Sequence, residues 1–206
     1  MALVLFILAL SLTVMRASAA EPAANFRDPA WYSLGRGGVW DVVGTNEVRQ
    51  AEYAEPWKNN GFNLPLDQAG TMEYEFGVRV LHGTSGGIYV LADATNGVDR
   101  GTSYLLWYAE STNGGGRAEF SLAKFIRDQR QSWAPVVRLP VKLGEWATLR
   151  VRIATATGEF VVHCNGKEVA RLKDETPIHS GNHVSLHTCV SAVAYRDLRI
   201  RRIAEA

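Results

Sequence analysis

The C-terminal part of the chain, from residue 144 onward, alternates apolar and polar side chains with the two-residue period of a β-strand. Leu149, Val151 and Ile153 would face one way, with arginines between them. The dipeptide Asn165-Gly166 follows the next such run and is a strong signal for a tight hairpin between antiparallel strands. This part of the chain therefore predicts an antiparallel sheet, with strands at residues 147–153, 159–164, 167–172, 181–187 and 192–203.

The same pattern continues upstream. Thr71 to Leu81 alternates most clearly, and turns rich in Gly and Asn divide the other runs, at residues 39–43, 47–53, 87–92, 103–109 and 117–124. No run of helical period is long, although Leu122 to Arg130 could form one short helix. Many short strands without helical partners predict an all-β fold, a two-sheet antiparallel sandwich of jelly-roll type with little helix.

The N-terminus has the features of a secretory signal. Leu3 to Met15 is apolar but too short to span a bilayer comfortably, and Ala17-Ser18-Ala19 supplies small residues for cleavage before Ala20. We expect a signal peptide at residues 1–19, a lead-in segment at 20–30 and a single domain at 31–206. The mature protein would then be secreted or periplasmic, with no membrane span.

The charge balance of the chain argues against one class of partner, and its cysteine content allows one disulfide. The chain has 22 basic and 21 acidic residues, a net charge of +1, which argues against a nucleic-acid partner. The one dense basic cluster, at the chain's end, is interpreted as a solvated strand face: Arg196, Arg199, Arg201 and Arg202. Cys164 and Cys189 could form a disulfide in an oxidising compartment, and the alternative is two buried thiols.

Several segments together resemble a known family. A Ser-Gly turn precedes a Gly-Ile strand at residues 85–88, Gly144-Glu145-Trp146 precedes a strand, and Asn165-Gly166 makes a hairpin before the closing segment at 194–200. This order is similar to the 3-keto-disaccharide hydrolase domain family, within the concanavalin A-like lectin/glucanase superfamily. The resemblance implies a concanavalin A-like jelly roll that acts on a glycoside or keto-disaccharide.

Three carboxylates are the candidate catalytic groups. Glu73 and Glu75 are two apart on one strand, so their side chains share a face about 6.5–7 Å apart, a separation that could serve acid–base chemistry on a sugar. Arg79 on the same face could keep one of them ionised and contact substrate. Glu110, at the end of another strand, is the third candidate. The alternative for the glutamate pair is an ordinary solvated face.

Tryptophans are the candidate sugar-stacking groups, because an indole packs well on the apolar face of a sugar. Trp57 and Trp133 lie in polar segments at the rim, and Trp107 lies in a central strand, where core packing is the alternative. Trp40 and Trp146 are assigned to the core.

A loop rich in oxygen ligands could hold calcium through Asp93, Asn96 and Asp99, although a plain turn prefers the same residues. We expect no other cofactor. No signature of a serine hydrolase, a zinc protease or a phosphate-binding loop is present. The sequence therefore predicts an exported domain that acts on carbohydrate as a hydrolase or a lyase. The alternatives are a non-catalytic lectin-like module and a cell-surface protein-interaction sandwich.

Overall fold

All regular structure in the described residues is β-strand. The computed structural model describes residues 23–33, 39–51, 60–94, 101–112, 115–133 and 135–204, and every strand pair in them is antiparallel. No helix in these residues is long and apolar enough to cross a membrane. The predicted two-sheet antiparallel sandwich is confirmed.

The first sheet has eight strands. Its order is β1 (Tyr32–Ser33), β4 (Asn60–Ala69), β14 (Ser180–Thr188), β6 (Ser85–Ala92), β7 (Ser103–Glu110), β8 (Arg117–Ile126) and β10 (Val137–Lys142), with β9 (Gln129–Trp133) also paired to β8. Neighbours such as β14 and β6 are far apart in the sequence, so long-range pairing builds the centre of this sheet.

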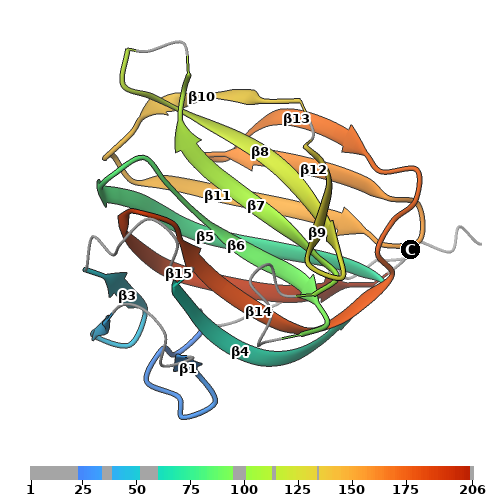
Figure 1. The fold of residues 1–206 in the computed structure, drawn as a ribbon, viewed down its shortest axis with the longest axis horizontal. Helices are drawn as coiled ribbons and strands as arrows, with labels where there is room; N and C mark the ends of the chain where they lie inside the picture. The colour runs from blue at the N-terminus through green and yellow to red at the C-terminus, as the bar shows by residue number, and fades with distance from the viewer. Residues whose placement is uncertain are drawn as a thin grey trace, which may run out of the picture.

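The second sheet has seven strands. Its order is β13 (Lys167–Lys173), β12 (Glu159–Cys164), β11 (Ala147–Ala154), β5 (Thr71–His82), β15 (Ala192–Ile203), β3 (Glu47–Gln50) and β2 (Trp40–Val43). Figure 1 shows the two sheets as superimposed layers, with β6, β7, β8 and β14 in front of β5, β11 and β15. Each sheet therefore has one face toward its partner and one outer face.

One hydrophobic core fills the space between the sheets. On β5 the core side chains alternate with polar ones, so Tyr74, Phe76 and Val78 are fully buried, whereas Glu75 between them is partly exposed. Ile88 on β6 and Leu106 on β7 meet them from the eight-stranded sheet. This alternation fixes which side chains each sheet presents outward.

The hairpin expected at Asn165-Gly166 is present between β12 and β13. Both residues have positive φ, 50° and 81°, as a two-residue type I′ turn requires. The Asn165 side-chain oxygen also accepts a hydrogen bond of 2.9 Å from the amide of Thr148 on β11. The turn is thereby tied to the next strand of its sheet.

Three parts of the fold differ from the sequence-based expectation. Residues 60–69 form β4, for which the sequence predicted no strand, because Gly61, Asn63 and Pro65 are typical of a loop. Residues 129–133 and 137–142 form β9 and β10, for which the sequence predicted no strand, since residues 125–137 were expected to be irregular. The short helix expected at Leu122 to Arg130 is wrong, because β8 continues to Ile126 and turns into β9. In each case pairing to a neighbouring strand outweighs local preference.

A buried ion pair closes one end of the sandwich. Lys124 on β8 lies 2.8 Å from Asp174, in the segment that joins β13 to β14. The Tyr104 hydroxyl donates to the same carboxylate at 2.6 Å and accepts from the amide of Ile178 at 3.0 Å. These contacts hold the crossover between the two sheets against the strands of the eight-stranded sheet.

Candidate functional site

The outer face of the eight-stranded sheet carries a second set of packed side chains. Tyr89, Leu105, Ala123 and Phe125 alternate with core residues on β6, β7 and β8, and they form a cluster of their own beside Trp107. Tyr89 packs edge-on to Phe125, with ring centroids 5.9 Å apart. These four side chains are only 0–5% exposed, so they form a small core on this side of the sheet, and the half-buried Trp107 beside it marks the candidate site.

Trp107 lies in a row of residues that crosses four strands. Its neighbours in register are Ser121 on β8, Gly87 on β6 and His187 on β14. The Trp107 and His187 rings approach across Gly87, with centroids 5.7 Å apart and planes inclined by 40°. A β-carbon on Gly87 would lie 3.2 Å from the Trp107 ring and 2.5 Å from the carbonyl oxygen of Leu106. The glycine therefore permits the ring arrangement.

Tyr195 supports this row from inside the core. It comes from β15 in the other sheet, and its hydroxyl accepts from the Gly87 amide at 2.8 Å and lies 3.0 Å and 2.5 Å from the carbonyl oxygens of Gly87 and His187. Gly86 leaves room for the phenol, because a β-carbon there would lie 2.7 Å from its hydroxyl. Burial raises the pKa of Tyr195, so the hydroxyl stays protonated and can donate.

Glu119 brings a carboxylate to the same face. It is two residues from Ser121 on β8, alternates with the core residue Phe120, and is only 9% exposed. It forms no hydrogen bond or ion pair with any described residue. Its oxygens are not among the buried side-chain atoms that lack a partner, so they are open to solvent and can accept hydrogen bonds from a ligand.

A buried amide lies farther along the face. Asn63 on β4 pairs in register with Ser185 on β14 and is fully buried. Its nitrogen donates to the carbonyl of Tyr32 at 3.3 Å, while its side-chain oxygen has no hydrogen-bond partner among the described residues. Because Asn63 is fully buried, this oxygen is not open to a ligand at the surface.

The predicted catalytic carboxylates do not meet on this face. Glu73 and Glu75 lie on the outer face of the seven-stranded sheet, on the opposite side of the molecule from Trp107. Each is taken up by an arginine of β15: Arg201 bonds Glu73, and Arg199 bonds Glu75 at 2.8 Å. Glu110 is exposed at the end of β7, on the side opposite to Trp107 in the strand's alternation. Glu73, Glu75 and Glu110 therefore do not share a groove with Trp107 in the structure.

The predicted substrate-binding residues lie in different parts of the structure. Trp107 lies on the candidate face, half-buried, and packs against the buried cluster there, so the structure is compatible with both the stacking role and the core-packing alternative. Arg79 lies on the other sheet and stacks on Trp146 at 4.9 Å, so Trp146 is an outer-face residue and not a core one. Trp57 lies outside the described residues. Trp133 is in β9 and pairs in register with Ala123, but its side chain is outside the described part of the structure.

The predicted calcium loop is described only at its start. Asp93 accepts a hydrogen bond of 2.7 Å from the amide of Thr102, which closes the loop, while Asn96 and Asp99 lie outside the described residues. Asp93 also lines a pocket of about 340 Å³ with polar residues that include Asp67, Asn182 and Arg202. The described residues contain no group of three or more His, Cys, Asp or Glu side chains placed to hold a metal ion.

The predicted disulfide is not present, because Cys164 and Cys189 are not bonded to each other in the structure. Cys164 on β12 points into the core between the sheets, and burial raises the pKa of its thiol to about 11. Cys189 lies in the turn between β14 and β15. The two residues lie on separate elements that do not pair with each other, so the buried-thiol alternative describes Cys164 correctly.

Sequence reasoning missed Glu119, Asn63 and Tyr195 as parts of a site. The alternation in residues 117–124 could have shown that Glu119 and Ser121 share a face with Ala123. Nothing local marks Asn63, because β4 itself was not foreseen. The role of Tyr195 depends on contacts with strands more than a hundred residues earlier in the chain.

Solved structures match this fold, whereas no protein-family model and no curated protein sequence matches the chain. The carbohydrate-binding module CBM66 from Bacillus subtilis has a TM-score of 0.64 at 12% identity, over 84% of this chain and 96% of that chain. A Bacillus subtilis protein of unknown function with a galectin-like fold has a TM-score of 0.62 at 11% identity, over 88% and 97%. A Parabacteroides distasonis protein provisionally named a glycosyl hydrolase has a TM-score of 0.54 at 16% identity, over 84% and 99%.

These similarities define the class of the fold. The chain folds as an antiparallel two-sheet sandwich that resembles galectin-like folds, and the jelly-roll fold that the sequence predicted is confirmed. The narrower resemblance, to 3-keto-disaccharide hydrolase domains, is not confirmed. At such low identities the likeness concerns fold alone, so function has to be argued from the site.

Proposed function

We propose that the protein binds carbohydrate on the outer face of its eight-stranded sheet. The observation that carries the proposal is the row in which the Trp107 and His187 rings approach across Gly87, with the unpaired Glu119 carboxylate on the neighbouring strand. An indole packs against the apolar C–H face of a sugar, and a carboxylate accepts hydrogen bonds from its hydroxyls. His187 is only 2% exposed, so its role is to support the Trp107 ring from below. The site thus offers both kinds of contact that a sugar needs.

The fold comparisons support the same proposal. Two sandwiches that resemble this one are a carbohydrate-binding module and a protein provisionally named a glycosyl hydrolase. Fold alone does not transfer their functions. One of them is named a carbohydrate-binding module, so a sandwich of this kind is compatible with the glycan binding that the aromatic and polar residues here suggest.

Binding without hydrolysis is the form of the function that the geometry favours. Glycoside hydrolysis commonly uses two carboxylates about 5–9.5 Å apart. On the outer face of β6, β7, β8 and β14, Glu119 is the one carboxylate that these described strands carry. Glu73 and Glu75 lie on the other sheet, in ion pairs. The keto-disaccharide hydrolase activity implied by the sequence resemblance therefore has no acid–base pair on this face to support it.

Glycan-array screening followed by titration of the best neutral ligand tests the proposal. We expect Trp107→Ala to abolish detectable binding and Glu119→Gln to weaken it about 10- to 100-fold, the effect of losing a charged hydrogen bond. Glu159→Gln, an exposed carboxylate on the other sheet, is the matched control and should bind normally. Equal affinity of the Trp107→Ala variant and the unmodified protein would refute this site. Turnover of a bound glycoside would show that binding is not the whole activity.

A further inference from the structure

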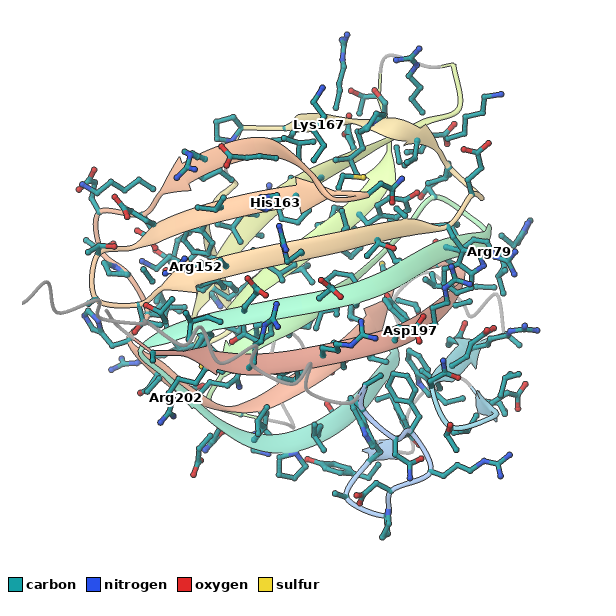
Figure 2. All side chains as sticks on the ribbon, turned by 180° about the vertical axis from the view of Figure 1, so that it is seen from behind. Arg79, Arg152, His163, Lys167, Asp197 and Arg202 are labelled. Atoms are coloured by element: carbon teal, nitrogen blue, oxygen red, sulfur yellow. The ribbon has the colours of Figure 1, made fainter. Side chains whose placement is uncertain are left out.

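The outer face of the seven-stranded sheet carries two rows of alternating charge. The register places Glu75 between Arg150 on β11 and Arg199 on β15. It places Glu73 in the same way between Arg152 and Arg201. Each row therefore reads Arg–Glu–Arg across three adjacent strands. Figure 2 views the molecule from this side, with Arg152 on β11.

Only one arginine of each row is used in an ion pair. Glu75 is bonded by Arg199 at 2.8 Å, and Glu73 is bonded by Arg201. The side chains of Arg150 and Arg152 form no hydrogen bond or ion pair with any residue that the structure describes. Arg152 is exposed and Arg150 is half-buried. Two adjacent guanidinium groups are thus available on β11.

Two more arginines extend the face toward the other end of β5. Arg79 and Arg196 both stack on Trp146, at 4.9 Å and 4.1 Å from the ring centroid. Arg196 reaches the indole across Gly77, where a β-carbon would lie 2.7 Å from the Arg196 side chain. The Nε of Arg79 is buried and lacks a hydrogen-bond partner among the described residues. The stack holds both guanidinium groups in place at a reduced entropic cost for a later ligand.

The face is a local concentration of positive charge in a nearly neutral chain. We define the arginine face as the six arginines and two glutamates that point outward from β11, β5 and β15: Arg79, Arg150, Arg152, Arg196, Arg199, Arg201, Glu73 and Glu75. With Asp197 of β15, whose exposed carboxylate lies 3.7 Å from Arg196, the excess on this side is three positive charges. The whole chain has an excess of one, with 22 basic and 21 acidic residues, so the remainder has an excess of two negative charges. Such asymmetry directs an anionic partner to one side of the molecule.

We propose that the arginine face is a second binding surface, specific for an acidic polysaccharide that carries carboxylate or sulfate groups. Alternate arginines on one strand are about 6.7 Å apart, and β11 is separated from β15 by about 9.6 Å. Guanidinium groups on this grid can bond several anionic groups along one extended chain, each by a two-pronged contact. This surface is separate from the face that contains Trp107, so it does not rest on the proposed neutral-glycan site.

The chemistry of the face favours a polysaccharide over other polyanions. Single-stranded nucleic acid is held by aromatic rings open to stacking, but the Trp146 ring is already covered by two guanidinium groups. An anionic membrane surface is held more firmly where apolar side chains insert into it. Among the described residues of β5, β11 and β15, Leu81 is the one large apolar side chain that is exposed. A flexible acidic glycan needs neither stacking nor insertion.

The test compares dextran sulfate and polygalacturonate with uncharged dextran, by titration of the full-length mature protein at several salt concentrations. We expect binding to both acidic polymers, none to dextran, and a steep loss of affinity with salt. Arg150→Glu combined with Arg152→Glu should weaken binding by about tenfold or more and flatten the salt dependence. Arg27→Glu combined with Arg127→Glu changes net charge equally at exposed turns and is the matched control.

Several outcomes would overturn the proposal. Equal losses in both double variants would show that net charge alone matters, and tighter binding to single-stranded DNA or to anionic phospholipid vesicles than to dextran sulfate would show a different partner. If the two glutamate substitutions lower the melting temperature, the titrations are repeated with Arg150→Gln combined with Arg152→Gln. An unchanged affinity in that glutamine variant also refutes the proposal. The two sites are distinguishable, because Trp107→Ala should leave polyanion binding intact, and the arginine variants should still bind neutral glycan.

Discussion

The Tyr195 hydroxyl lies 2.8 Å from the backbone nitrogen of Gly87, so one side chain from the seven-stranded sheet reaches through the core to the backbone beneath the Trp107 row. The same hydroxyl lies within hydrogen-bonding distance of the carbonyl oxygens of Gly87 and His187. Two strands that carry the candidate site are therefore joined to the opposite sheet by a single buried phenol. The contact links the stability of the sandwich to the geometry of its outer face.

Tyr195→Phe should lower the free energy of unfolding by about 1–3 kcal/mol, because buried backbone groups of Gly87 and His187 lose a partner. The ring still fills the same space, so the loss reports the hydrogen bonds and not a cavity. Urea unfolding measures the effect. Tyr32→Phe, at a half-buried tyrosine of β1, is the control and should change stability by less than about 0.5 kcal/mol. An unchanged urea midpoint in Tyr195→Phe would show that water replaces the hydroxyl without cost.

Gly87→Ala should weaken glycan binding more than it destabilises the fold. The added β-carbon would lie 2.5 Å from the carbonyl oxygen of Leu106 and 3.2 Å from the Trp107 ring, so β6 or the indole has to shift. Overpacking of this kind costs about 1–3 kcal/mol in stability. Titration with the ligand found by array screening, combined with urea unfolding, separates the two effects. Native affinity in a folded Gly87→Ala variant would contradict the conclusion that Gly87 permits the arrangement of the Trp107 and His187 rings.

Local pattern predicted most strands because their alternation survives in the structure. Thr71 to His82 is the clearest case, since each apolar residue from Met72 to Val80 points into the core. Asn60 to Ala69 escaped prediction because Pro65 and the amide and glycine residues around it favour a turn. Pro65 pairs with His183 next to a register shift, where the ladder is already irregular. Tertiary pairing therefore decided this strand.

The candidate site was less predictable than the fold because it depends on register between distant strands. The expectation that Glu73 and Glu75 share a face was correct. The pairing of β5 with β15, which places Arg201 and Arg199 opposite them, could not be read from local sequence. Trp107 was identified as a candidate, but Gly87 and His187 become its neighbours only through strand order. Alternation gives the face of a residue, and only topology gives its neighbours.

Cys164 and Cys189 are not joined by a disulfide, so a reducing agent should leave the melting temperature unchanged. A fall in melting temperature on reduction would show that a disulfide forms in solution. Cys164→Ser should lower the free energy of unfolding by about 1–3 kcal/mol, because it places a hydroxyl in the apolar core. Cys189→Ser, in the turn after β14, is the matched control and should have a smaller effect.

Acid should destabilise the protein through Asp174. Burial alone would raise the pKa of this carboxyl group, but the hydrogen bonds from Lys124, Tyr104 and the Thr176 amide outweigh it and hold the pKa below its ordinary value. A carboxylate with a lowered pKa in the folded state contributes stability that is fully present above about pH 4, the ordinary range for aspartate. That contribution is lost as the pH falls through the folded-state pKa.

Urea unfolding from pH 7 down to pH 2.5 measures this contribution. Asp174→Asn should cost roughly 3 kcal/mol at pH 7, because it leaves the buried Lys124 ammonium without its counter-charge. Its stability should then fall less steeply below pH 4 than that of the unmodified protein. Glu168→Gln is the matched control, since it breaks the exposed pair with Arg171 and should cost less than about 1 kcal/mol. Parallel pH profiles for Asp174→Asn and the unmodified protein would mean that other carboxylates govern the acid transition, and that the Lys124–Asp174 pair adds little to closing the sandwich.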